Sequence, residues 1–128
     1  MIPKFRAWLK KEQKMDNYID HISWLEDELY CIGDGITYMV SAEDLELMQS
    51  TGLVDKNGKE IFEGDILGTK DGLLNGVVQY SSDLGMWIIS LIRYNNFERL
   101  CNVATSREII GNVWEDGDLI DDKKTSEN

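Results

Sequence analysis

The predicted fold depends most on residues 64–92, which read GDILGTKDGLLNGVVQYSSDLGMWIISLI. Three runs in and next to this stretch, residues 66–70, 76–81 and 86–93, are rich in the β-branched and aromatic residues typical of strands. Two turn signals, each with an aspartate followed by a glycine, separate them. Short strands at such close spacing favour an antiparallel barrel or sandwich over a parallel sheet.

The third of these strands is apolar on both faces, because alternate residues of a strand point to opposite sides. The two apolar faces comprise Trp87, Ile89 and Leu91 on one side and Met86, Ile88 and Ile92 on the other. A strand of this kind has to be covered on both sides. We therefore predict that the N-terminal hairpin layer or another subunit covers it. The candidate interaction residues are Trp87, Ile88, Ile89, Leu91 and Ile92.

Upstream, residues 5–9 and 15–24 flank the polar segment 10–14 and predict a hairpin. A further strand is expected at residues 36–40, while residues 25–30 read as a loop or a helical turn.

Two local signals follow these strands. Ser41 followed by acidic residues predicts the start of a short helix that runs to about Met48. Asn57-Gly58 is the favoured pair for a two-residue hairpin turn. At the other end, residues 108–114 predict a last strand, and the polar tail that follows is expected to be flexible.

Composition limits the classes of partner. The 128-residue chain contains 24 acidic and 13 basic residues and has a net charge of −11. Nonspecific binding to nucleic acid depends on basic side chains that displace counterions from phosphates, so we do not expect it here. The basic residues gather at one place, which we interpret as a solvated hairpin: Lys4, Arg6, Lys10, Lys11 and Lys14.

The compartment is predicted from what the sequence lacks. No stretch approaches the ~20 apolar residues of a membrane span, and the first residues lack the pattern of a signal peptide. Cys31 and Cys101 each lie among apolar residues and are interpreted as reduced, buried thiols. We therefore expect a cytoplasmic protein that does not bind membranes.

No pattern of residues predicts catalysis, a cofactor or a metal site. His21 is the only histidine, and no serine occupies the turn typical of a hydrolase nucleophile. Glu60, Glu63 and Asp65 form the best acidic cluster and could hold magnesium in a metal-dependent nuclease. The simpler interpretation is that Gly64 forms a tight turn and Asp65 accepts backbone amides there.

Three blocks of sequence carry a resemblance to a known family: KFRAW at residues 4–8, LMQSTGLVDKNGKEIFEGDIL at residues 47–67 and EIIGNVWE at residues 108–115. In this order and spacing the chain resembles the YopX family of small proteins, encoded mainly by phages and prophages of Gram-positive bacteria. The resemblance implies a mostly β fold, in which an SH3-like barrel carries an additional N-terminal β layer and one short helix. It also implies no catalytic residues, because the family has no established activity.

The resemblance divides the chain into a single domain over residues 1–117 and an acidic flexible tail over residues 118–128. Within the domain, residues 1–60 would form the N-terminal β layer and residues 61–115 the barrel. We expect a non-enzymatic interaction module that forms homo-oligomers and binds a host or phage protein in the host cytoplasm. The alternatives are an acidic decoy that binds a host nucleic-acid-binding protein and, second, the metal-dependent nuclease.

Overall fold

The computed structural model describes residues 4–25, 28–33 and 36–120. The protein is mostly β, as predicted, and its strands form two antiparallel sheets. The chain divides into two compact units, Met1–Ser50 and Thr51–Asn128. The boundary predicted from the sequence lies after residue 60 instead.

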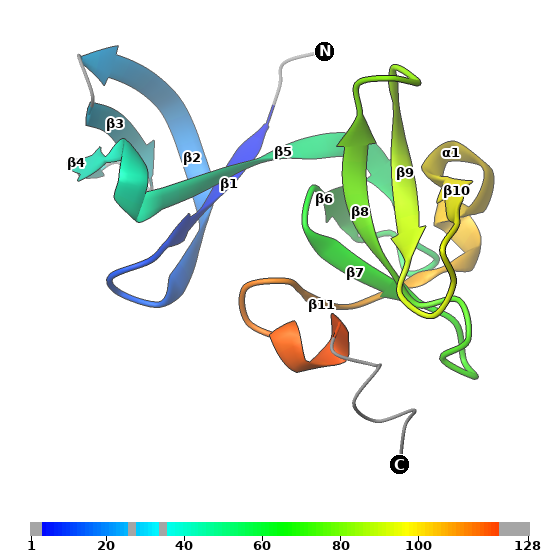
Figure 1. Cartoon of the computed structure of the whole chain (residues 1–128). Coiled ribbons are helices and arrows are strands. Elements are labelled where there is room, and N and C mark those ends of the chain that lie inside the picture. The colour runs from blue at the N-terminus through cyan, green and yellow to red at the C-terminus, as the bar shows by residue number, and fades with distance from the viewer. Residues whose placement is uncertain (1–3, 26–27, 34–35, 121–128) are drawn as a thin grey trace. The chain divides into compact units, whose positions relative to one another are not determined.

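The first unit is built on an N-terminal hairpin, shown in blue in Figure 1. β1 pairs antiparallel with β2 on one side and with β5 on the other. The sheet to which they belong has the order β4-β3-β2-β1-β5-β6, and the end of β5 and all of β6 belong to the second unit. Its strands are β1 Phe5–Leu9, β2 Lys14–Leu25, β3 Glu28–Gly33, β4 Ile36–Ser41, β5 Leu45–Val54 and β6 Glu60–Phe62. The predicted hairpin and the strand at residues 36–40 are therefore confirmed.

β1 is the centre of the first unit because its side chains are buried on both faces. Ala7 and Leu9 form a core cluster with Leu45 of β5 on one face. Arg6 and Trp8, which alternate with them, are only 7% and 4% exposed. β1 is therefore covered on both faces even though one of its residues, Arg6, is charged.

The helix predicted from Ser41 to Met48 does not form. Ala42–Asp44 make a single 3-10 turn, and β5 begins at once with Leu45. The Ser41 side chain makes no capping hydrogen bond. Residues 45–49 instead pair one by one with β1, which satisfies their backbone groups across a sheet and overrides the local signal. Of residues 25–30, predicted as a loop or helical turn, Leu25 ends β2 and residues 28–30 begin β3, while residues 26–27 lie outside the described part of the chain.

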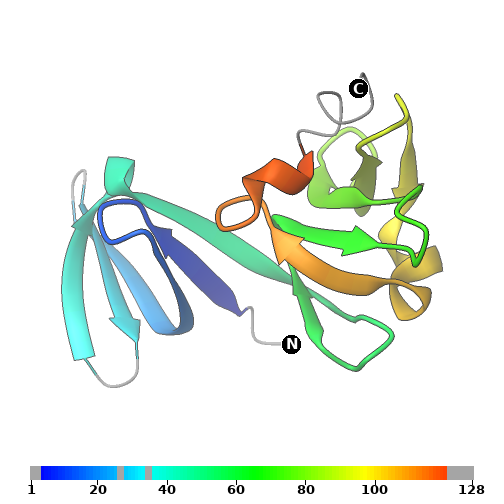
Figure 2. The same ribbon diagram turned by 90° about the horizontal axis from the view of Figure 1, so that it is seen from below.

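The second unit is a meander whose last strand returns to its first. The sheet order is β10-β9-β8-β7-β11, and every neighbouring pair is antiparallel. The sheet curls around its core (Figures 1 and 2). Its strands are β7 Asp65–Gly68, β8 Gly76–Ser81, β9 Met86–Leu91, β10 Phe97–Arg99 and β11 Glu108–Asn112. The strands predicted within this unit are confirmed, with shorter ends, whereas β6 and β10 were not predicted.

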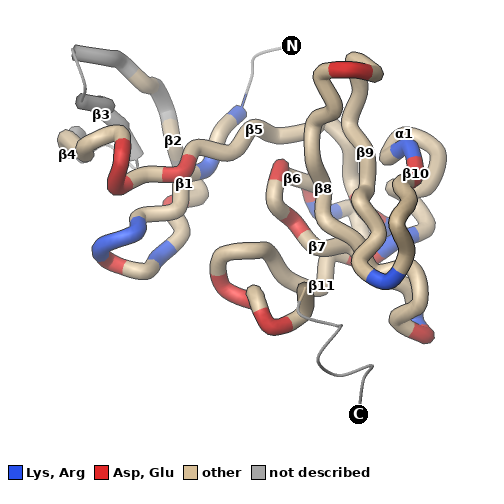
Figure 3. The backbone as a smooth tube through the Cα atoms, in the orientation of Figure 1, with Lys and Arg blue, Asp and Glu red and all other residues tan. Residues whose placement is uncertain are grey.

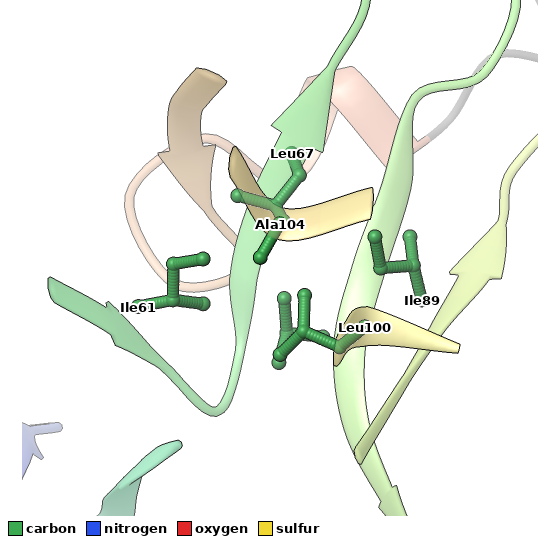
Figure 4. Close-up of a cluster of buried hydrophobic side chains, with 6 residues drawn as sticks. Ile61, Leu67, Ile89, Leu100 and Ala104 are labelled. Carbon is green, nitrogen blue, oxygen red and sulfur yellow. The ribbon is translucent and has the colours of Figure 1, made fainter. Parts of the chain in front are cut away.

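One short helix lies in a place that the sequence did not predict. α1, Leu100–Val103, follows β10 and continues into the 3-10 turn Ala104–Ser106. It inserts Leu100 into the core of the unit (Figure 4). That core consists of Ile61, Leu67, Val78, Ile89, Leu100 and Ala104. Nowhere in the described chain is a helix long and apolar enough to cross a membrane.

The turn between β5 and β6 differs from the predicted one by one residue. Gly58 N donates to Asp55 O at 3.0 Å, so the central residues are Lys56 and Asn57. Gly58 has a φ of +79°, whereas Asn57 keeps a negative φ. A two-residue turn centred on Asn57-Gly58 would need positive φ at both positions. The Asp55 carboxylate fixes the turn in this position, because it accepts the backbone amides of Asn57 and Lys59.

Asp55 is buried and accepts three backbone amides. Its Oδ1 accepts Asn57 N and Lys59 N, each at 2.9 Å, and its Oδ2 accepts Ile109 N of β11 at 3.0 Å. Burial raises the pKa of Asp55, but these amides outweigh it and hold the pKa below its ordinary value of 3.8. The ionised carboxylate therefore stabilises the folded protein.

We predict that Asp55→Asn lowers the free energy of unfolding by about 1–3 kcal/mol, because an amide cannot accept all three donors. A carboxylate with a lowered folded-state pKa contributes stability that is complete above the ordinary value of 3.8. That contribution disappears as the pH falls through the folded-state pKa. Urea unfolding should therefore show a gap between wild type and variant at neutral pH that narrows below about pH 4.

Asp71→Asn is the matched control. Asp71 also accepts a backbone amide, that of Leu73, but in an exposed turn. Its replacement should change stability less than replacement of Asp55. Equal losses for the two variants would contradict the role assigned to Asp55.

Candidate interaction surface

The residues predicted for interaction divide between two faces of β9. Ile89 is fully buried, and Trp87 and Leu91 pack partly buried against the same core cluster. This face is therefore covered by the unit's own core, and no second subunit is needed there. Ile88 lies on the opposite face and is half-buried, as is Ile92, which follows the end of the strand.

We name this opposite side the outer face, and strand register defines its members. Residues directly opposite each other in paired strands share a face. Ile88 pairs with Gln79 of β8 and Arg99 of β10, and Ser90 pairs with Val77 and Phe97. The complete set is Val77, Gln79, Ser81, Met86, Ile88, Ser90, Phe97 and Arg99.

The outer face combines apolar area with exposure. Phe97 is 43% exposed, and Val77, Met86 and Ile88 are half-buried. The outer face is not accessible on β7, because Ile66 of β7, which pairs with Val77, is fully buried. The accessible part therefore spans β8, β9 and β10.

Carboxylates are missing from the outer face. Between Gly72 and Phe97 the sequence has one acidic residue, Asp83, and one basic residue, Arg93, although 24 of the 128 residues of the chain are acidic. Figure 3 shows β8 and β9 free of charged residues. An acidic residue (red) lies in the turn between these two strands, and a basic residue (blue) lies in the connection from β9 to β10. The absence of acids and the presence of Met, Phe and Arg are features that interfaces share, although the face also carries Gln79 and two serines. This scarcity of acids is visible in the sequence, but no single motif reveals it.

An ion pair holds β10 at the edge of this surface. Arg107 Nη1 lies 2.8 Å from Glu98 Oε1, and Arg107 Nη2 donates to Glu98 Oε2 at 3.0 Å. The arginine is buried, and the pair combines one charge-assisted hydrogen bond, from Nη2 to Oε2, with a close ionic contact between Nη1 and Oε1. Glu98 pairs with Ile89, so it lies on the core side of β10. Because neighbouring residues of a strand point to opposite sides, Phe97 and Arg99 lie on the outer face while Glu98 is paired on the core side.

One member of the acidic cluster considered for a nuclease, Asp65, binds the backbone of its own chain. Asp65 is 2% exposed, and its Oδ2 accepts Phe62 N at 2.8 Å. Gly64 has a φ of +87°, as a tight turn requires. The structural interpretation of Gly64-Asp65 is thus confirmed. Within the described residues, no three His, Cys, Asp or Glu side chains come together as a metal site, and the side chain of His21 lies outside them.

The basic cluster of the first unit is not simply a solvated hairpin. Arg6 is buried in β1, and the lysines of the β1–β2 turn meet acids near the start of β5. Lys10 lies 3.2 Å from Glu46, and Lys11 lies 3.3 Å from Asp44. These exposed pairs neutralise the patch and contribute little to stability.

The prediction for the cysteines is wrong for one of them. Cys101 is exposed on α1, because Leu100 beside it takes the core position. The side chain of Cys31 lies outside the described part of the structure.

We predict that Ile89→Ala and Ile88→Ala separate the two faces of β9. Ile89→Ala leaves a cavity in the core and should lower the free energy of unfolding by about 2–5 kcal/mol. Ile88→Ala removes a half-exposed side chain and should cost about 1 kcal/mol or less. Urea unfolding of the two variants measures the difference. A larger loss at Ile88 would mean that the faces are assigned the wrong way round.

The sequence and the architecture of this chain are similar to those of known proteins. A family model described as YopX protein matches residues 4–121. The crystal structure of protein EF1440 from Enterococcus faecalis is 27% identical, covers 94% of this chain and 99% of its own, and has a TM-score of 0.63. The crystal structure of YopX from Bacillus subtilis is 16% identical, covers 90% of this chain and 95% of its own, and has a TM-score of 0.56. A search of curated proteins found no match.

The family model spans both units, and the structure of the Enterococcus protein is matched over nearly its full length. The Bacillus structure, at its lower identity, supports the likeness of fold. The resemblance noted in three blocks of sequence thus extends over almost the whole chain. The chain belongs to the YopX family.

Proposed function

We propose that the protein is a non-enzymatic protein–protein interaction module that self-associates through the outer face of β8, β9 and β10. The observation that carries the proposal is the apolar, carboxylate-free character of this face in a chain with a net charge of −11. In biological terms we propose a phage or prophage accessory protein acting in the host cytoplasm. A host or phage protein is a further partner in this view.

Charge supports a second copy as the occupant. Two molecules of charge −11 repel each other wherever their carboxylates approach within about a Debye length, ~8 Å at physiological salt. The outer face is where this repulsion costs least, because it carries Arg99 and no acid. A two-fold axis through the face would place the same apolar residues of both copies against each other, the usual arrangement in homodimers.

The topology of the second unit bears on its fold class. A meander from β7 to β10, a helical turn and a last strand paired back to β7 is an order that fits the SH3-like barrels. We therefore propose that class for residues 61–115. Folds of this kind host many unrelated functions, so the argument for function rests on the surface alone.

The buried carboxylates support a structural role over catalysis. Asp55 and Asp65 are both buried, and their oxygens accept backbone amides. A catalytic carboxylate needs a free oxygen directed at a substrate. These two side chains serve the chain itself.

We predict that Ile88→Glu converts the self-associated protein to a monomer. A carboxylate in the centre of the outer face would be desolvated and would repel its copy across the interface. Sedimentation velocity at micromolar concentrations measures the oligomeric state, and circular dichroism checks that the variant remains folded. Leu119→Glu, an exposed apolar position in the turn Gly117–Ile120, is the matched control and should leave association unchanged.

The salt dependence of self-association provides a second test in the same experiment. Because like charges oppose association, added salt should strengthen it for the wild type. A wild-type protein that stays monomeric at micromolar concentrations would overturn the proposal, as would loss of association in both variants.

A further inference from the structure

The chain contains two Asn-Gly pairs, and the fold treats them differently. Asn57-Gly58 lies in the turn between β5 and β6, and Asn75-Gly76 lies at the start of β8. Asparagine is a thermally labile residue. Its side-chain amide is most reactive when the next residue is glycine, whose backbone nitrogen meets no Cβ in its approach to the side-chain carbon. Reaction then depends on whether the folded chain leaves both groups room to move.

Asn57 and Gly58 have that room. Both are exposed, and apart from Gly58 and its two chain neighbours no atom lies within 4 Å of the position where a Cβ on Gly58 would be. The Asn57 amide has one long, exposed contact, in which Nδ2 donates to Glu108 Oε1 at 3.3 Å. Gly58 N donates to Asp55 O at 3.0 Å, so a small opening of the turn precedes reaction.

Asn75 and Gly76 are held in place. Asn75 Oδ1 accepts Thr69 N at 3.3 Å, and the Asn75 carbonyl accepts Ile92 N at 2.9 Å. Gly76 is buried between strands, and a Cβ there would collide with Ile89 and with the backbone of Ser90. Asn75-Gly76 therefore serves as an internal reference, because it has the same two residue types but its side chain and backbone are held in place.

We propose that Asn57 is a site of spontaneous deamidation. The Gly58 nitrogen loses its proton to hydroxide and attacks Asn57 Cγ. The new N–Cγ bond closes a five-membered imide, the Cγ–Nδ2 bond breaks, and Nδ2 leaves as ammonia with a proton from water. Water then opens the imide at either carbonyl and leaves an aspartyl or isoaspartyl residue at position 57.

The product alters the contacts that attach the turn to β11. A carboxylate replaces the donor to Glu108 and faces a second carboxylate at hydrogen-bond distance. The isoaspartyl form also lengthens the backbone by one carbon, between the two amides that Asp55 holds, Asn57 N and Lys59 N. Both products weaken the turn, so the modification acts as a slow, irreversible change in the stability of the second unit.

Peptide mapping by mass spectrometry tests the reaction. The purified full-length protein is incubated at mildly alkaline pH, and the amide-to-carboxyl conversion at each asparagine is followed over time. We expect conversion at Asn57 that is at least tenfold faster than at Asn75. In urea, where the fold is lost, both sites should react at similar rates. Equal rates in the folded protein, or an Asn57 that reacts in urea alone, would overturn the proposal.

A double-mutant cycle tests the consequence. Asn57→Asp should lower the melting temperature, and Glu108→Gln in the same chain should restore most of the loss by removing the facing charge. Asn75→Asp is the reference for a held site. If the effect of Asn57→Asp is the same with and without Glu108→Gln, the facing carboxylates do not carry it, and the proposed mechanism of destabilisation fails.

Discussion

The arrangement of the second unit depends on one buried carboxylate. Asp55 bonds two amides of its own turn and one amide of β11, a strand 54 residues further along the chain. Next to it, Lys56 N donates to the carbonyl of Arg107. The side chain of Arg107 in turn holds Glu98 of β10. A continuous set of polar contacts therefore runs from the β5–β6 turn through β11 to the strand at the edge of the outer face. A short edge strand has few contacts of its own, so its position has to come from such a set.

Much of the second unit could be predicted from the sequence because its signals are local. Runs of β-branched and aromatic residues, separated by turns that contain aspartate and glycine, identify β7, β8 and β9 without knowledge of their partners. The failures share a cause. Residues 45–49 alternate like a strand, but the acids after Ser41 favoured a helix, and pairing with β1 decided the outcome. The turn at Asn57-Gly58 was displaced by a side chain, Asp55, whose third bond is made to β11. Long-range contacts of this kind leave no local pattern to find.

The candidate surface was only half predictable for the same reason. Alternation shows that β9 is apolar on two faces, but not which face the sheet curls around. That choice becomes visible through the neighbours of β9. Val78 pairs with Ile89 and both enter the core, so Ile88 lies outside. The charge-poor stretch from Gly72 to Phe97 was readable from the start, and its meaning appears once register collects its residues on one side of three strands.

The charge of the chain also discriminates between kinds of partner. A decoy for nucleic-acid-binding proteins would present carboxylates to a basic surface, and its contact residues would be acidic. The outer face has the opposite character, since its members carry one positive charge, at Arg99, and no negative charge. Such a face gains little from a basic partner and avoids repulsion by an acidic one. Among acidic partners, a second copy of this chain is the one that certainly carries a matching apolar area, because in the proposed contact the same residues would supply both sides.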